Sequence, residues 1–352
     1  MAVTLTSLTD IAALGFDDII DVRAPAEFAE DHIPGAISLP VLDDAERARV
    51  GTIYKQVNPF TARKLGAALV ARNAAAHLEG VLADRPGGWR PLLYCWRGGQ
   101  RSGAFTSILT QIGWRAEIIS GGYKAWRSLV VQAVYDQPVV SKVVVLDGNT
   151  GSAKTELLAL MAGMGLQVLD LEGMANHRGS VFGAMGGQPS QRAFETRLAY
   201  ALAALDPARP VVVEAESSKV GECRVPPELW KAMVAAPRVA VRASVAARAG
   251  YLTRAYADLT ADPARLVQVV DQLRGAHSHE MIAEWQAMAG AGAFADLAAG
   301  LMQRHYDPRY EKHRARMGAG VVEVEAAGLG PDDLPDLAGR IADQVRRLTG
   351  RG

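Results

Sequence analysis

The sequence is poor in cysteine and has no excess of charge, and each absence excludes a class of protein. Only 2 cysteines occur among 352 residues, too few for a disulfide framework, so we expect a reducing compartment. Lys plus Arg total 38 and Asp plus Glu total 38. Because no global electrostatic field draws the chain toward DNA, RNA or acidic lipid, any RNA site has to be a local basic cluster.

Long apolar runs are also missing. No stretch reaches the roughly 18 uninterrupted apolar residues of a membrane-spanning helix. The amino-terminal segment carries acidic residues and lacks a basic start, which argues against a signal peptide. We therefore expect a cytoplasmic protein with neither membrane nor DNA as a partner. Its 49% hydrophobic and 22% charged residues are typical of globular chains, and its length favours two domains.

Two successive patterns of strands and helices divide the chain near residue 137. Short apolar segments with strand-like residue types alternate with helical patterns such as that of residues 61–77. The strand segments are 18–22, 91–95, 116–119, 143–148, 167–171, 210–216, 238–243 and 320–325. Several are continuously apolar, as in parallel sheets that are covered on both faces. The sequence thus predicts an α/β domain over 1–137 and a parallel α/β domain over 138–352, whose carboxyl-terminal part is helical.

The strand segment 91–95 delivers Cys95 to a loop rich in glycine and arginine. The loop consists of Trp96, Arg97, Gly98, Gly99, Gln100 and Arg101. Glycines let the backbone curl tightly, and inward amides, two guanidinium groups and a following helix amino terminus favour a thiolate. A buried structural cysteine would need none of these neighbours. We therefore predict that Cys95 is a catalytic nucleophile and that the loop binds an anion.

At this point a family resemblance appears. The segment DVRAPAEFAEDHIPGAISLP at 21–40, followed by YCWRGGQRSGA at 94–104, resembles a rhodanese domain over about the first 135 residues. The resemblance implies that Cys95 accepts a sulfur-family atom and passes it on. Four further residues match the scaffold motif of that family, and we interpret them as structural: Asp21, Arg23, His32 and Gly35.

The cysteine loop departs from the usual rhodanese pattern in its length. Arg101 lies six residues after Cys95, one more than in the usual loop, which resembles rhodanese-like phosphatases. A larger cradle suits a tetrahedral oxyanion, and it equally suits a phosphorus-bearing chalcogen donor such as selenophosphate. The sequence leaves both readings open.

A phosphate-binding loop lies between a strand and a helix in the second half. It comprises Gly148, Asn149, Thr150, Gly151, Ser152, Ala153, Lys154 and Thr155. Loop amides and the helix amino terminus can surround phosphate oxygens, Lys154 adds positive charge, and the Thr155 hydroxyl can ligate Mg²⁺. Ala153 replaces the glycine of the standard pattern, so phosphate binding is better supported than triphosphate cleavage. We predict no resident metal centre.

Several local motifs then identify one family. QVLDLEG, NHRGS, FG and QPSQ follow the phosphate loop, and VEAES at 213–217 and HYDPRYEKH at 305–313 come later. Together with the rhodanese half they resemble the bacterial tRNA 2-selenouridine synthase family. The resemblance implies a transferase that acts on wobble 2-thiouridine of tRNA: the sulfur is geranylated from geranyl diphosphate, and the geranylated sulfur is then replaced by selenium from selenophosphate.

The resemblance also assigns roles. Cys95 would hold selenium, and the phosphate loop with Lys154 would grip the diphosphate. Selenophosphate and geranyl diphosphate would be co-substrates, with no tightly bound cofactor. The partners would be tRNA bearing 2-thiouridine at the wobble position and a supplier of selenophosphate.

Secondary candidates are less specific. Glu214 and Glu216 end a strand where an acidic residue often organises metal and water, but strand-end charges are common. His177, Arg178 and Arg192 could contact tRNA, but such residues also occupy ordinary surface loops. In the carboxyl-terminal third, basic and aromatic residues favour amphipathic helices over an RNA site. These are Tyr251, Arg254, Tyr256, His305, Tyr306, Arg309, Tyr310, Lys312 and His313.

Three other functions compete. A small-molecule or nucleotide kinase with a rhodanese regulatory module requires ATP turnover at the phosphate loop, and Ala153 argues against it. A rhodanese-type sulfurtransferase or phosphatase would work through Cys95 alone. A non-catalytic RNA-binding adaptor leaves the cysteine loop unexplained.

Overall fold

The chain forms two compact units. The computed structural model describes residues 2–97, 99–180, 182–183, 186–215, 217–314 and 320–350. Unit 1 contains the residues up to Gln137 together with Pro189–Ala204, and unit 2 contains Pro138–Gln188 and the residues from Leu205 on. One helix of unit 1 is therefore contributed by residues that follow the phosphate loop in the chain.

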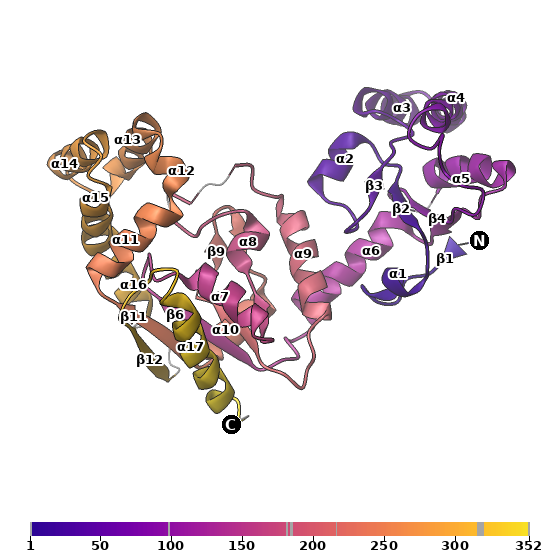
Figure 1. The fold of residues 1–352 in the computed structure, drawn as a ribbon. Coiled ribbons are helices and arrows are strands. Elements are labelled where there is room, and N and C mark those ends of the chain that lie inside the picture. The colour runs from indigo at the N-terminus through magenta and orange to yellow at the C-terminus, as the bar shows by residue number, and fades with distance from the viewer. Residues whose placement is uncertain are drawn as a thin grey trace. The chain divides into compact units, whose positions relative to one another are not determined.

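Unit 1 is built on a parallel five-stranded sheet in the order β1-β5-β4-β2-β3. Figure 1 shows its helices around this sheet, with α3 and α4 side by side. The elements are β1 (Ala2–Val3), α1 (Asp10–Ala13), β2 (Asp18–Asp21), α2 (Pro25–Glu30), β3 (Ile37–Ser38), α3 (Asp44–Gln56), α4 (Pro59–Glu79), β4 (Pro91–Tyr94), α5 (Gln100–Ile112), β5 (Glu117–Ile119), α6 (Gly122–Val131), a π-helical turn (Gln132–Asp136) and α9 (Gln191–Ala203).

The core of unit 1 explains where its cysteine loop lies. All four residues of β4 are buried, and Ile20, Leu93 and Phe105 pack in one apolar cluster that also includes Cys95. Strand β4 lies between β2 and β5, and its carboxyl end is at the edge of the sheet where ligands bind in open parallel α/β sheets. Cys95 follows directly after that end.

Unit 2 has a second parallel five-stranded sheet, in the order β12-β11-β6-β8-β7, and a separate antiparallel pair, β10-β9. Its elements are β6 (Val143–Gly148), α7 (Lys154–Gly163), β7 (Gln167–Leu169), α8 (Leu171–Ala175), β8 (Val211–Glu214), β9 (Lys219–Val220), β10 (Cys223–Arg224), α10 (Pro227–Ala235), β11 (Arg238–Ala243), α11 (Val245–Ala255), α12 (Ala257–Thr260), α13 (Pro263–Asp271), a 3₁₀ turn (Gln272–Gly275), α14 (His279–Gly290), α15 (Phe294–Leu301), a π-helical turn (Met302–Tyr306), α16 (Asp307–Arg314), β12 (Val321–Ala326) and α17 (Leu334–Leu348).

The central strands of unit 2 are buried along their whole length. Every residue of β6 and of β8 is buried, which confirms the expectation of a sheet covered on both faces. Leu157 of α7 and Ile341 of α17 join the core against the sheet. Helices α12–α15 enclose a second cluster around Trp285. The predicted α/β class with a helical carboxyl-terminal part is confirmed.

Element boundaries differ from the predicted ones where polar side chains cap helices. The predicted strand over 167–171 ends at Leu169, because Asp170 accepts a hydrogen bond from the Gly173 amide at 2.7 Å and starts α8. The short strands β1 and β3 have two residues each, too few for a recognisable alternation. No helix in the described ranges has the length and apolar character needed to cross a membrane.

Candidate functional site

The sulfur of Cys95 lies at the amino terminus of α5 and receives several hydrogen bonds. The side chain is 4% exposed. The Gly99 amide and the Ser102 hydroxyl each donate to Sγ at 3.3 Å. Gly99 is the residue that precedes the first turn of α5, and Ser102 is fully buried within that turn. The loop thus directs amide and hydroxyl donors at the sulfur, as a thiolate requires.

These contacts shift the acidity of the thiol. Burial raises the pKa of Cys95, but hydrogen bonds from Ser102 and Gly99 and the charge of Arg101 outweigh it, so the pKa is lowered from its ordinary value. Arg101 is itself paired, because its Nη1 lies 2.7 Å from Oε2 of Glu27. Burial raises the pKa of Glu27 and the contact with Arg101 lowers it, with a lowered pKa as the net result.

The cysteine loop opens into a wide pocket of about 820 Å³. Five of the predicted loop residues line it with Cys95: Trp96, Arg97, Gly99, Gln100 and Arg101. Residues of α3 form its other wall. Gly98, the remaining predicted member, lies outside the described residues.

The residues interpreted as structural make contacts within the scaffold of unit 1. Arg23 is 1% exposed and pairs with Asp21 at 2.7 Å, and its guanidinium lies 3.9 Å from the ring centre of Tyr123. His32 stacks on a neighbouring aromatic ring and its Nδ1 lies 2.9 Å from the Phe28 carbonyl oxygen. Gly35 has a φ of +80°, which a side chain would disfavour. These observations agree with a scaffold role.

In unit 2 the phosphate loop connects β6 to α7, as the sequence predicted. Gly151 has a φ of +83° and Ala153 a φ of +59°. Ala153 therefore adopts the left-handed conformation that the standard glycine would adopt, although it carries a Cβ. Ala153 and Asn176 are the two non-glycine residues with positive φ in the described ranges, and both line the same pocket. Strained backbone of this kind is typical of ligand sites.

Two charged contacts set the shape of the loop. Lys154 Nζ donates to the Gly148 carbonyl oxygen at 3.2 Å and lies 5.7 Å from the ring centre of Tyr310. Arg248, 5% exposed, donates to the Thr150 carbonyl oxygen at 3.2 Å. The guanidinium of Arg248 is held by both carboxylate oxygens of Asp307, at 2.9 and 2.8 Å.

The phosphate pocket has a volume of about 390 Å³. It is lined by Thr150 to Thr155 and by acidic and aromatic residues that follow β7 or lie on α11 and α16. The Thr155 hydroxyl donates to Oε2 of Glu172 at 3.0 Å. Asp170 and Glu172 thus place carboxylates beside the loop, a role that sequence reasoning had offered to Glu214 and Glu216.

Glu214 has a different place. It is fully buried, and its Oε1 accepts a hydrogen bond from the Glu172 amide at 2.6 Å. It therefore supports the segment that carries Glu172. Glu216 lies outside the described residues. Among the residues that the structure describes, no group of three or more His, Cys, Asp or Glu side chains is arranged to hold a metal ion.

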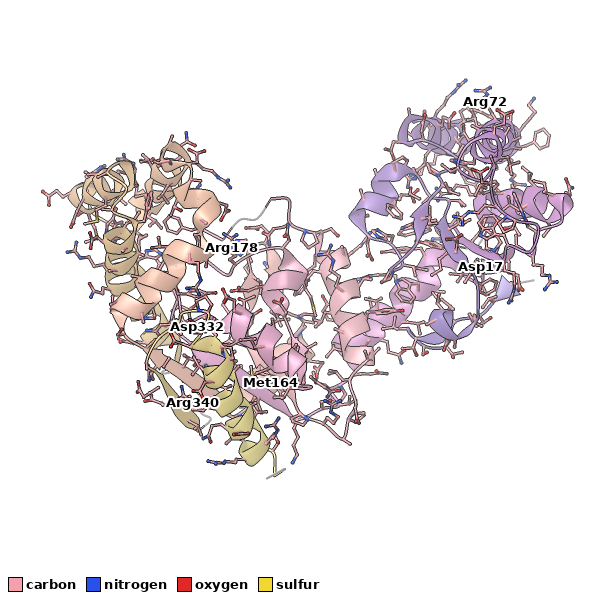
Figure 2. All side chains as sticks on the ribbon, viewed as in Figure 1. Asp17, Arg72, Met164, Arg178, Asp332 and Arg340 are labelled. Carbon is pink, nitrogen blue, oxygen red and sulfur yellow. The ribbon has the colours of Figure 1, made fainter. Side chains whose placement is uncertain are left out.

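His177 and Arg178 line the phosphate pocket. The pKa of His177 is lowered, because burial outweighs two acidic neighbours, and its Nδ1 accepts a hydrogen bond from the Gly179 amide at 3.0 Å. Arg178, labelled in Figure 2, pairs with Asp258 at 3.0 Å. Arg192 belongs to unit 1, where it pairs with Glu30 at 2.9 Å.

A narrow apolar cavity of about 70 Å³ adjoins the phosphate pocket. The two share Thr150, Ser180, Leu252 and Tyr256 in their walls. The rest of the cavity wall is almost entirely apolar: Phe182, Thr253, Leu259, Thr260, Leu266, Phe294, Leu297, Ala298, Leu301, Met302 and Tyr306. The junction thus sets an apolar wall beside the wall of the phosphate pocket.

Sequence reasoning missed the residues that complete these pockets. Tyr251, Tyr256 and Tyr310 line the phosphate pocket, whereas their spacing favoured ordinary amphipathic helices. Ser102 was missed too, although a hydroxyl directly after Arg101, in the first turn of a helix, was a usable signal.

Comparisons with known proteins agree with this arrangement. Residues 141–284 match the family model described as the tRNA 2-selenouridine synthase AAA domain, and residues 4–129 match the rhodanese-like domain. The tRNA 2-selenouridine synthase of Pseudomonas syringae pv. syringae is 34% identical over 91% of this chain and 94% of its own length. That of Pseudomonas syringae pv. tomato is 36% identical over the same shares, and that of Aeromonas salmonicida is 37% identical over 80% of this chain and 71% of its own length.

Both halves of the chain are thus matched, in the order that the two sheets have in the structure. Relatives more than 30% identical match it over nearly their whole length. The chain belongs to the tRNA 2-selenouridine synthase family.

Proposed function

We propose that this chain is an enzyme that converts 2-thiouridine of tRNA to 2-selenouridine in two steps. In the first, the sulfur is geranylated from geranyl diphosphate at the pockets of unit 2. In the second, selenium that derives from selenophosphate and is held at Cys95 replaces the geranylated sulfur. The names of the relatives support the tRNA substrate and the selenouridine product, and the two sites support the division of labour.

The observation that carries the proposal is the junction of the phosphate pocket with the apolar cavity. Their shared walls let one ligand place a diphosphate against Lys154 and a hydrocarbon chain among Leu259, Leu297 and Met302. Geranyl diphosphate has this composition. The cavity is narrow, so the chain enters by displacing side chains such as Met302, which is unbranched and adaptable.

Geranyl transfer is a displacement at an allylic carbon. The uridine sulfur attacks the first carbon of the geranyl chain, the carbon–oxygen bond breaks, and diphosphate leaves with the electron pair. The protein assists by neutralising the leaving group with Lys154 and the loop amides. Oxygen ligands from Thr155, Asp170 and Glu172 border the same space, and they would suit Mg²⁺. Bound there, the ion would supply further charge neutralisation.

Selenium exchange uses the other site. Alkylation turns the uridine sulfur into a leaving group, so a selenium nucleophile can add to the pyrimidine carbon and expel geranyl thiolate. Selenophosphate would enter the wide pocket beside Cys95, where Arg97 and the Gly99 amide border the space for its phosphate. The hydrogen-bonded sulfur of Cys95 is the group positioned to hold selenium.

Loading selenium on Cys95 takes two electrons from the reactants, and its release from Cys95 returns them. Water attacks the phosphorus of selenophosphate, and phosphate and selenide separate without oxidation. Forming a sulfur–selenium bond on Cys95 removes two electrons, which a disulfide of the cellular thiol pool accepts. After selenium has bonded to the pyrimidine carbon, two thiols cleave the sulfur–selenium bond and return the two electrons, which frees Cys95.

One assay tests the division of labour. Purified protein is incubated with 2-thiouridine tRNA, geranyl diphosphate, selenophosphate and a thiol together with its disulfide, and the nucleosides are analysed by mass spectrometry. Cys95→Ala should accumulate the geranylated nucleoside, whereas Lys154→Ala should leave 2-thiouridine unchanged. Cys223→Ala is the matched control, because Cys223 is equally buried but lies in the β9-β10 pair. Loss of geranylation in Cys95→Ala would contradict the scheme.

A second assay tests the apolar cavity. Leu297→Gln introduces an amide into the cavity wall, and the KM for geranyl diphosphate should rise by about tenfold or more, because a polar group without partners is costly there. Selenation of tRNA that is already geranylated should continue. An unchanged KM would place the geranyl chain elsewhere.

A further inference from the structure

The segment from α3 into α4 has an unusual charge composition. Residues 47–72 contain six basic residues and no Asp or Glu, in a chain whose total charges cancel. The basic residues are Arg47, Arg49, Lys55, Arg63, Lys64 and Arg72. Figure 2 labels Arg72 at the outer face of α4. This is the local basic cluster that an RNA-binding site requires in a protein of zero net charge.

Large apolar side chains are exposed between these charges. Tyr54 is 53% exposed, Val57 65% and Phe60 73%. Helix α3 buries none of its 13 residues, although a helix that packs only against its own domain normally hides one face. Apolar exposure of this kind marks a surface that binds something.

The positive charges are largely uncompensated. Arg47 pairs with Glu27 at 2.9 Å. In the described ranges, no ion pair involves Arg49, Lys55, Arg63, Lys64 or Arg72. The field of these groups therefore reaches solvent, where it attracts an anionic partner.

The surface is continuous with the cysteine pocket. Arg47, Tyr54 and Lys55 line the same pocket as Cys95, opposite the loop that carries Arg97. A partner bound on α3 can therefore extend into the pocket that Cys95 lines. Exposed rings next to basic side chains are the means by which proteins hold single-stranded nucleotides, since every base can stack and every phosphate can be paired.

We propose that residues 47–64 form the docking surface for the single-stranded nucleotides of tRNA that flank the target uridine. Tyr54 and Phe60 stack on bases, and Lys55, Arg63 and Lys64 pair with the phosphates. The surface thereby holds the uridine at the pocket of Cys95. This inference rests on the proposed function, because it takes the RNA to be the substrate of the selenium exchange.

The test compares RNA binding of two variants with equal loss of charge. Lys55→Ala/Arg63→Ala/Lys64→Ala removes three charges from the surface. The control, Lys231→Ala/Arg346→Ala/Arg347→Ala, removes three exposed charges from α10 and α17 of unit 2. Dissociation constants are measured for 2-thiouridine tRNA and for its isolated anticodon stem-loop over a range of salt concentrations.

The surface variant should bind both RNAs at least tenfold more weakly than wild type. In a plot of the logarithm of the binding constant against the logarithm of the salt concentration, the slope should be less steep by about two, since each lost phosphate contact removes roughly 0.7 to 0.9 from it. The control should match wild type. Phe60→Ser should weaken binding at least fivefold without changing the slope, and Phe60→Trp should restore it, because stacking is independent of charge.

A third measurement separates this inference from the proposed function. Selenium loading of Cys95, followed by the mass of the intact protein, should be normal in Arg63→Ala/Lys64→Ala, which keeps the pocket residue Lys55. Equal RNA affinity of the surface and control variants would overturn the inference, although wild type would still make 2-selenouridine. Normal RNA affinity combined with impaired loading would overturn it in favour of a protein that delivers selenophosphate.

Discussion

The hydrogen bond from Ser102 to Cys95 has a measurable effect on the reactivity of the thiol. Ser102→Ala removes the hydroxyl donor at 3.3 Å from Sγ and leaves the buried helix turn otherwise intact. Hydrogen bonds to charged groups contribute about 1.5–3 kcal/mol, and a donor to sulfur at this distance belongs at the lower end. Because about 1.4 kcal/mol is a factor of ten, the thiolate fraction at neutral pH should fall about tenfold.

The direction of the change in the pKa of Cys95 follows from the charge state that the hydrogen bond stabilises. Ser102 favours the thiolate and keeps the pKa of Cys95 low, so its removal raises the pKa and slows alkylation at neutral pH. At high pH, where both thiols are ionised, the two rates should converge. The assay follows iodoacetamide labelling of the Cys95 peptide by mass spectrometry from pH 6 to pH 10, with Ser107→Ala on the exposed face of α5 as the control.

Removing the partner of Arg101 should lower the pKa of Cys95, whereas removing Ser102 raises it. Glu27→Gln removes the carboxylate that neutralises Arg101 and preserves a side chain that can still occupy the start of α2. The freed charge of Arg101 should lower the pKa of Cys95 further and speed alkylation at neutral pH. If Ser102→Ala and Glu27→Gln shifted the rate in the same direction, electrostatic control of the sulfur by this loop would be refuted.

Three further predictions concern unit 2. Gly151→Ala should destabilise the fold by about 2–5 kcal/mol in urea unfolding, because an alanine would have to adopt a φ of +83° and its Cβ would lie 3.0 Å from the Arg248 carbonyl oxygen. As a control, Gly163→Ala has open space around it and should stabilise α7 by about 0.5 kcal/mol. Arg248→Met should cost about 3 kcal/mol and weaken diphosphate binding in calorimetry, since Asp307 loses its partner and the phosphate loop its brace. Burial and neighbouring positive charge lower the pKa of His305 to about 4. The unfolded chain therefore takes up a proton at this residue before the folded one does, and the free energy of unfolding should fall by roughly 3 kcal/mol as the pH drops from 6.5 to 4. In His305→Asn the free energy of unfolding should fall by less over the same pH range.

The sheets and loops of the two units were predictable because their signals are local. A run such as Val143 to Leu146 is apolar throughout, and the residues that follow carry the spacing of a phosphate loop. Cys95 was predictable for the same reason, since its glycines and arginines are sequence neighbours. The expected conflict at Ala153 is present in the structure as a positive φ, so a residue that breaks the motif keeps the backbone geometry that the motif serves.

The assignment of α9 to unit 1 was not predictable from local pattern. Its residues follow the phosphate loop in the chain, but Thr196 donates a hydrogen bond to Asp31 at 2.9 Å, and Glu195 forms an ion pair with Arg127. Both acidic groups are buried. Nothing in a helix of this composition indicates which of the two units it packs in, because that choice depends on partners more than 60 residues away.

The pocket walls in the carboxyl-terminal third were hidden for a related reason. The segment 305–310 has basic and aromatic residues at helical spacing, which is equally typical of a solvated amphipathic helix. In the structure, Tyr306 lines the apolar cavity, Asp307 holds Arg248 against the phosphate loop, and Tyr310 lies beside Lys154. One turn of helix thus connects both pockets, and a ligand that fills the cavity would press on the same turn that positions the phosphate loop. Because the polar contacts join residues from different elements, only the tertiary structure distinguishes this turn from ordinary surface.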